Sequence, residues 1–166
     1  MTVQHVLVPI DFSATADQAL TYAIALAQQL QARLTLLHVL DLLPVAMGEM
    51  PTGMTSTYLE TQETEAQQLL QASLERVQHA GLQGASLLVE GTPTQKIVET
   101  AGEQGVDLII MGTHGRTGLA HVFLGSVAEH VVRHAPCPVL VTRKTRDAPD
   151  TPATSADASP EQALSN

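Results

Sequence analysis

Glycine is concentrated in one fifteen-residue stretch, GTHGRTGLAHVFLGS at residues 112–126, which follows the apolar run VDLIIM. Its spacing is Gly112, two residues, Gly115, nine residues, and then Gly125 followed directly by Ser126. Glycine in a loop has a high entropic cost on folding, so it usually marks backbone that takes a positive φ or lies very close to another group. The pattern predicts that a ligand lies against this backbone, although plain loop flexibility would also explain it.

The C-terminal end of this stretch is suited to an anion. Ser126 and Glu129 have capping-box spacing, which predicts that Ser126 is the N-cap of a helix. A helix N-terminus carries unpaired N–H groups and the positive end of the helix dipole, and both attract phosphate. A phosphate chain could therefore lie between the turn at residues 112–115 and the amides of Ser126 and Val127.

The stretch matches neither of the two common phosphate-binding loops. A P-loop requires a lysine before the serine or threonine, and no lysine precedes Ser126. The dinucleotide fingerprint G-x-G-x-x-G would follow the first strand, where this sequence reads PIDFSA. The residue pattern by itself therefore supports an anion site without naming its ligand.

Alternating strands and helices must position these residues. Apolar runs predict strands at residues 3–9, 33–39, 85–90, 106–111 and 139–143. Helical spacing and cap signals at Ser13, Thr57, Thr92 and Ser126 predict helices that end near residues 30, 80, 103 and 134. Because the strands are apolar along their length and are separated by helices, we expect an α/β fold with a doubly wound parallel sheet covered on both faces. Such sheets bind ligands beyond the carboxyl ends of the strands, where the winding reverses.

The chain of 166 residues is long enough for one domain. Pro44, Gly48, Pro51 and Gly53 predict a loop over residues 40–56, whose role the sequence does not reveal. From Lys144 the chain is rich in Pro, Ser, Thr, Ala and Asp, which predicts a disordered tail over residues 144–166 after a folded domain of residues 1–143.

Composition argues against several classes of function. The net charge of −9 disfavours nucleic acid, and an aromatic content of 2% disfavours a stacking platform for single strands. Cys137 is the single cysteine, so an internal disulfide is excluded, and we expect it to be a small packing residue. No apolar run reaches the roughly 20 residues that cross a bilayer, and no signal-peptide pattern opens the chain, so a cytoplasmic location without membrane contact is expected.

Histidine gives only a weak indication of a metal. His130 and His134 are spaced i, i+4 on a predicted helix, but H-E-x-x-H is missing and no third ligand is apparent. We therefore expect no metal held by protein side chains, and expect His134 to complement the helix dipole. His38, in an apolar strand, is expected to be a satisfied core residue.

Longer strings resemble the universal stress protein family. DLIIMGTHGRTGLAHVFLGSVAEHVVRHAPCPVLV looks like the C-terminal half of that family, and HVLVPIDFS, LTLLHV and EGTPTQKIVETA fit it as well. The resemblance covers about residues 3–143, and the G-x2-G-x9-G-[ST] spacing is that of the family's ATP-binding branch. It implies a five-stranded sheet in the order 3-2-1-4-5, with the reversal between strands one and four.

The resemblance also implies a nucleotide site. Pro9 and Asp11 would line the ribose and adenine, and Val39 would bond adenine through its backbone. The residues wrapping the ribose and phosphates would be Gly112, His114 and Gly115. The full set that it implies is Pro9, Ile10, Asp11, Val39, Met111, Gly112, His114, Gly115, Arg116, Gly125, Ser126 and Val127.

Some of these residues have simpler explanations. Asp11 could be simply a cap of the first helix, a role that it would share with Ser13. Arg116 could reach a terminal phosphate or could be a solvated surface residue. Ser126 is expected to cap its helix whether or not phosphate binds.

Three functions follow as hypotheses. The first is a regulatory nucleotide-binding protein that binds ATP with Mg²⁺ held by the phosphates, acts through an unknown protein partner, and forms a homodimer through strand five. The second is a slow ATPase or nucleotidyl transferase, for which the glycine-rich stretch offers no lysine and no carboxylate before Glu129. The third is a dimeric interaction module with a vestigial site.

Overall fold

The computed structural model describes residues 2–41, 55–113 and 124–143. The tail at residues 144–166 and most of the loop predicted at residues 40–56 therefore lie outside the described residues.

Five parallel strands form one sheet in the order β3-β2-β1-β4-β5. The strands are β1 His5–Pro9, β2 Arg33–Leu40, β3 Gly84–Glu90, β4 Leu108–Gly112 and β5 Val139–Thr142. Val6 of β1 pairs with Leu34 of β2 on one side and with Leu108 of β4 on the other. The expected fold class and strand order are confirmed, and the winding reverses between β1 and β4.

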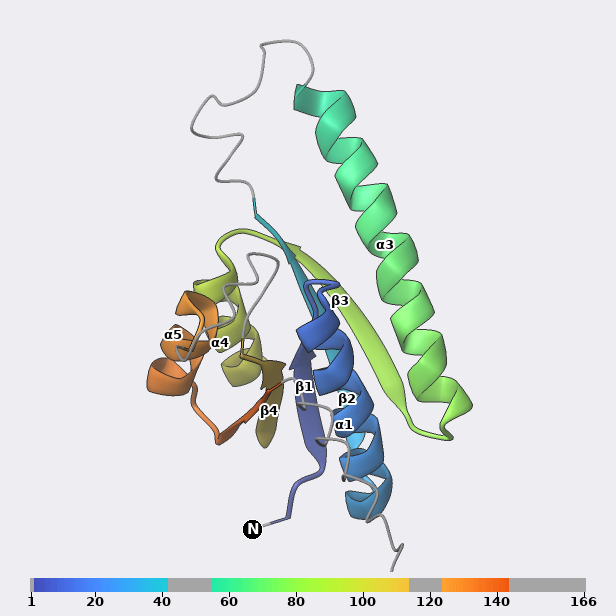
Figure 1. The fold of residues 1–166 in the computed structure, drawn as a ribbon, viewed down its shortest axis with the longest axis vertical. Coiled ribbons are helices and arrows are strands. Elements are labelled where there is room, and N and C mark those ends of the chain that lie inside the picture. The colour runs from blue at the N-terminus through green and yellow to red at the C-terminus, as the bar shows by residue number, and fades with distance from the viewer. Residues whose placement is uncertain (1, 42–54, 114–123, 144–166) are drawn as a thin grey trace, which may run out of the picture.

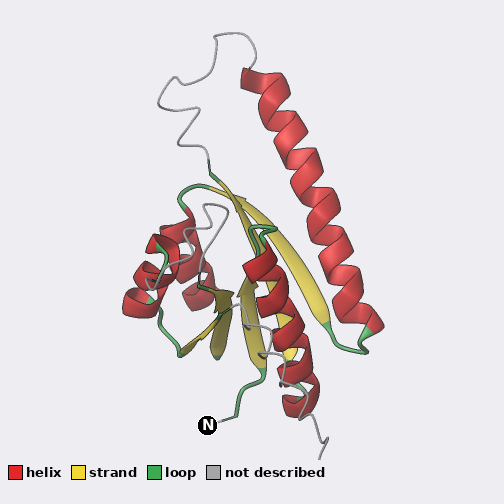
Figure 2. Cartoon of the chain, in the orientation of Figure 1, coloured by secondary structure: helices red, strands yellow, loops and turns green. Residues whose placement is uncertain are grey.

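Helices cover both faces of the sheet. They are α1 Ala14–Leu30, α3 Thr55–His79, α4 Pro93–Glu103 and α5 Ser126–His134. Figure 1 shows α1 and α3 on one face and α4 and α5 on the other, and Figure 2 shows the same three layers by type of structure. No helix in these described ranges is long and apolar enough to cross a membrane.

Successive residues of the central strands enter opposite cores, which explains why these strands are apolar along their length. Val6 and Val8 are fully buried in the core beneath α1 and α3. Leu7 and Ile109 are fully buried in the core beneath α4 and α5. Both faces of the sheet are thereby covered, so a ligand is expected at the ends of the strands.

The first helix is capped as predicted. The Ser13 side chain accepts the N–H of Ala16 at 3.2 Å. Asp11 contacts this cap residue. Its Oδ1 accepts the N–H of Ser13 at 3.0 Å and the hydroxyl of Ser13 at 2.6 Å. The carboxylate therefore orients the cap from the end of β1.

The capping prediction for Ser126 is wrong. The N-cap of α5 is Gly125, with extended backbone (φ −62°, ψ 152°), and Ser126 is the first helical residue. The Gly125 carbonyl already accepts the N–H of Glu129 at 2.9 Å, so the first helical hydrogen bond starts one residue earlier than the capping-box pattern suggests.

Two other cap predictions need correction. The helix predicted to start at Thr57 is α3, which begins at Thr55, so Thr57 lies within its first turn. Thr92 is the N-cap of α4 with Pro93 at the first helical position, as predicted, but its side chain makes no capping hydrogen bond.

Candidate functional site

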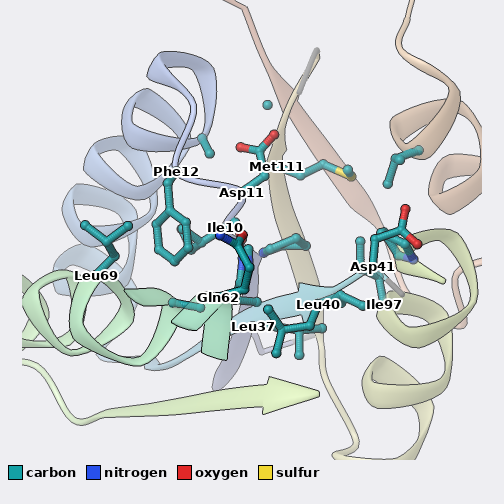
Figure 3. Close-up of a pocket in the computed structure, with 18 of the residues that line it drawn as sticks. Ile10, Asp11, Phe12, Leu37, Leu40, Asp41, Gln62, Leu69, Ile97 and Met111 are labelled. Atoms are coloured by element: carbon teal, nitrogen blue, oxygen red, sulfur yellow. The ribbon is translucent and has the colours of Figure 1, made fainter. Parts of the chain in front are cut away.

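A cavity of about 540 Å³ lies at the carboxyl ends of the central strands. Its floor comes from the ends of β1, β2 and β4, and its walls come from α3, α4 and α5. Figure 3 shows Gln62 and Leu69 of α3 on one side of it and Asp41 and Ile97 on the other. The cavity therefore lies at the winding reversal, where doubly wound sheets bind ligands.

Every sequence-predicted site residue in the described ranges lines this cavity. These residues are Pro9, Ile10, Asp11, Val39, Met111, Gly112, Gly125, Ser126 and Val127. The remaining three, His114, Gly115 and Arg116, lie outside the described residues. The fold thus brings together segments that are up to about a hundred positions apart in the sequence.

The N-terminus of α5 opens on the cavity without a side-chain cap. The N–H of Gly125 is occupied, because it donates to the Thr113 carbonyl at 2.8 Å. The next amides, of Ser126, Val127 and Ala128, precede the first possible intrahelical acceptor and all three residues line the cavity. These N–H groups and the helix dipole can bind an anion.

Gly112 is needed for packing. A Cβ at this position would lie 2.9 Å from the backbone carbon and oxygen of Thr15 and 3.0 Å from its Cβ. The first glycine of the motif therefore allows the first turn of α1 to lie directly against the end of β4. This explanation does not require a ligand.

The turn between β1 and α1 is held by β2. The Ile10 N–H donates to the Leu37 carbonyl at 2.8 Å, and His38 Nδ1 lies 2.6 Å from the Ile10 carbonyl oxygen. His38 is buried and hydrogen-bonded, as predicted, and its ring lies 4.4 Å from that of Phe12, centroid to centroid. Phe12 has a φ of 62°, which is uncommon for a residue with a side chain and costs on the order of 1–3 kcal/mol.

Negative charge surrounds the cavity. The acidic side chains that line it are Asp11, Asp41, Glu63, Glu65 and Glu90. No lysine or arginine lines it within the part of the chain that the structure describes. Among the described residues, the backbone amides at the start of α5 are therefore the groups that suit an anionic ligand.

The sequence interpretation missed the wall that α3 contributes. Tyr58, Gln62, Ala66 and Leu69 line the cavity and recur at a spacing of four, four and three residues. The sequence predicts a helix over this segment, but helical spacing does not show that the helix lines a cavity beyond the sheet. The first turns of α3 instead extend past the carboxyl ends of the strands (Figure 1).

The other singled-out residues lie away from the cavity. The rings of His130 and His134 stack at 4.2 Å, and His134 Nδ1 lies 2.8 Å from the His130 carbonyl oxygen near the C-terminus of α5. Cys137 packs against the core beneath α4 and α5, and burial raises the pKa of its thiol. Both observations agree with structural roles.

Comparison with known proteins identifies the family. The model of the "Universal stress protein family" matches residues 2–143. Universal stress protein MJ0531 of Methanocaldococcus jannaschii is 35% identical over 143 residues, which cover 86% of this chain and 84% of that protein. The structure of MJ0577 from the same organism superposes with a TM-score of 0.80 at 31% identity, covering 89% of this chain and all of that one.

Nucleotides occur in more distant structures of the same fold. A universal stress protein in complex with cAMP is 24% identical, and one from Archaeoglobus fulgidus in complex with dAMP is 23% identical, each with a TM-score of 0.62. At this identity the likeness establishes the fold alone. The family model and the closer relatives decide the assignment, and this chain belongs to the universal stress protein family.

Proposed function

We propose that this protein binds ATP in the cavity at the strand ends and acts as a regulatory nucleotide-binding protein. The observation that carries the proposal is the uncapped N-terminus of α5, which presents amides to a cavity formed by the ends of β1, β2 and β4. Amides that can bind an anion at one end and apolar residues along the floor suit a nucleotide better than a purely polar or purely apolar ligand.

The ligand would lie along the edge of the sheet. Its phosphates would accept hydrogen bonds from the amides of Ser126 and Val127, and Gly125 would leave room for them. Asp11 and Val39, at the ends of β1 and β2, would contact the ribose and the base. His114, Gly115 and Arg116 belong to the proposed site on the family resemblance.

Mg²⁺ would enter with the phosphates. The carboxylates around the cavity would repel a bare triphosphate, and the described lining residues supply no positive side chain against this repulsion. Mg²⁺ bound to phosphate oxygens would lower the charge of the ligand. We therefore expect ATP to bind more tightly with Mg²⁺ than without it.

Regulation would act through assembly. β5 pairs with β4 on one side and ends the strand order on the other. An edge strand of sequence VLVT can pair with a second copy. We propose a homodimer through β5 and a protein partner that responds to the nucleotide-bound form.

Calorimetric titration with ATP, ADP and AMP, each with and without Mg²⁺, tests the binding proposal. We expect ATP with Mg²⁺ to bind most tightly, and we expect Gly125→Val to abolish binding because its side chain would fill the space for the phosphates. The φ of −62° at Gly125 suits any residue, so the backbone tolerates the change. Gly102→Ala, in α4 and outside the set of residues that line the cavity, is a control. Absence of ATP binding to the unmodified chain would overturn the proposal.

A further inference from the structure

The cavity extends across neighbouring strands. Its floor includes Met111 and Gly112 of β4, Pro9 of β1 and residues 37–40 of β2, and these strands are adjacent in the sheet. Adjacent strands lie about 5 Å apart, so the floor spans roughly 10 Å from β4 to β2. The uncapped helix α5 lies near the β4 end, and α3, which packs on β2 and β3, lies at the other. A ligand whose phosphates bind at α5 therefore has its far end beside α3.

At this far end, α3 contributes one half-buried polar side chain to the described lining, that of Gln62. It lines the cavity one turn before Ala66, which is buried. Figure 3 shows Gln62 on the same side of the cavity as Leu69. Its side chain makes no hydrogen bond to any residue that the structure describes. The other glutamines in the middle of α3, such as Gln68, are exposed to solvent instead.

A carboxamide has both a donor and an acceptor and can make two hydrogen bonds to one edge of a base. Adenine presents an amine donor beside a ring-nitrogen acceptor, and a glutamine can satisfy both at once. This adenine edge is the one that bears N6 and N7; on the same edge guanine presents two acceptors, O6 and N7, which leaves the amide oxygen unpaired.

We propose that Gln62 is a specificity-determining residue that selects adenine over guanine nucleotides through the edge of the base. The proposal rests on the proposed function, because it requires a nucleotide with its phosphates at α5. It assigns to α3 a part in ligand choice that the glycine-rich stretch cannot have, since backbone amides at the phosphates do not distinguish one base from another.

Titration of ATP and GTP against three chains tests this assignment. The chains are the unmodified protein, Gln62→Leu, and the matched control Gln68→Leu on the exposed side of the same helix. We expect the unmodified protein to prefer ATP. We expect Gln62→Leu to lower the affinity for ATP about 10-fold or more, which is the contribution of one bidentate pair of hydrogen bonds. The affinity for GTP should change less. Gln68→Leu should keep the original ratio, and circular dichroism should show the same helix content in all three chains.

The possible outcomes separate the two proposals. If the unmodified protein binds ATP and Gln62→Leu leaves the ratio of ATP to GTP affinity unchanged, the role of Gln62 is overturned and the proposed function remains. If both glutamine variants lower the ratio equally, the effect belongs to α3 as a whole and the assignment to Gln62 is overturned. If the unmodified protein binds neither nucleotide, the proposed function is overturned and this assignment with it.

Discussion

Gly112 stands where the end of β4 meets the first turn of α1. A methyl group there would approach the Thr15 backbone to 2.9 Å, and backbone atoms cannot move aside as the end of a flexible side chain can. We therefore expect Gly112→Ala to lower the free energy of unfolding by about 1–3 kcal/mol, as other overpacked sites do. Urea denaturation without nucleotide measures this loss.

Gly102 in α4 is the control for this substitution. A Cβ there would meet only Pro136, at 4.0 Å, and the residue lies within a helix. Gly102→Ala should stabilise the protein by up to about 1 kcal/mol, because alanine loses less conformational freedom in a helix. Equal unfolding free energies for Gly112→Ala and the unmodified protein would show that the close contact with Thr15 relaxes, and that packing does not require glycine at this position.

Two serines at helix starts should differ in their effect on stability. The Ser13 side chain caps α1 through the N–H of Ala16, whereas Ser126 is the first residue of α5 and caps nothing. Ser13→Ala should cost about 1 kcal/mol of unfolding free energy, and Ser126→Ala should stay within about 0.5 kcal/mol. Thermal or urea unfolding of the two variants compares them directly. A larger loss from Ser126→Ala would restore the capping role that its spacing predicted.

At the scale of the elements, the amino ends of three strand segments meet at His5. Its Nδ1 lies 3.1 Å from an Arg33 guanidinium nitrogen, which can only donate, so Nδ1 accepts and Nε2 carries the hydrogen toward Thr35 Oγ1 at 2.8 Å. The Asp107 carboxylate accepts the N–H groups of Gln4 and His5, each at 2.9 Å. The arrangement holds β1 between β2 and the segment that leads into β4, and it requires a neutral His5.

This requirement predicts sensitivity to acid. Burial, with a contribution from the Arg33 charge, holds the pKa of His5 below its usual 6.5. The unfolded chain therefore binds this proton more readily than the native protein, so the stabilisation is present above pH 6.5 and is lost as the pH falls below it. We expect the unfolding free energy to fall between pH 7 and pH 5, and to fall less in His5→Gln, which keeps one donor and one acceptor without titrating.

Urea denaturation at several pH values measures that slope. His134→Gln is the matched control, because it removes an exposed histidine near the end of α5. The hydrogen bonds from the N–H groups of Gln4 and His5 lower the pKa of Asp107 below 3.8. Protonation of Asp107 would therefore destabilise the protein only below the range of pH 5 to pH 7 in which the slope is measured. An identical slope in His5→Gln and in the unmodified protein would contradict the proposed origin of the acid sensitivity.

The elements also show what the sequence could and could not predict. Each strand matched its apolar run to within two residues, because burial on both faces leaves an unambiguous apolar pattern. The start of α5 was misplaced by one residue, because Ser126 and Glu129 have capping-box spacing although the Gly125–Glu129 hydrogen bond makes Gly125 the N-cap. The wall formed by Gln62 was missed, because a helix pattern shows which residues share a face but not how far the helix extends beyond the sheet.

At the scale of the whole molecule, the site arises from topology. β1 and β4 are neighbours in the sheet although about a hundred residues separate them in the chain, and the helices that follow them pack on opposite faces. This divergence opens the sheet edge between Asp11 and Gly112, where the cavity lies. The resemblance to a family was needed to predict the strand order, because strand and helix patterns alone allow several orders for a doubly wound sheet.

The folded domain is expected to end at about residue 143. The family model ends at residue 143, and both buried cores are built by described residues that precede this position. We therefore expect a chain that ends after Arg143 to keep its melting temperature and its ATP affinity. A chain that ends after Ala135 is the control. It lacks β5, whose Val139 and Leu140 pack against the two cores, and it should melt far lower or fail to fold. Differential scanning calorimetry of the three chains measures their melting temperatures. A much lower melting temperature for the chain that ends at Arg143 would place residues 144–166 within the folded unit.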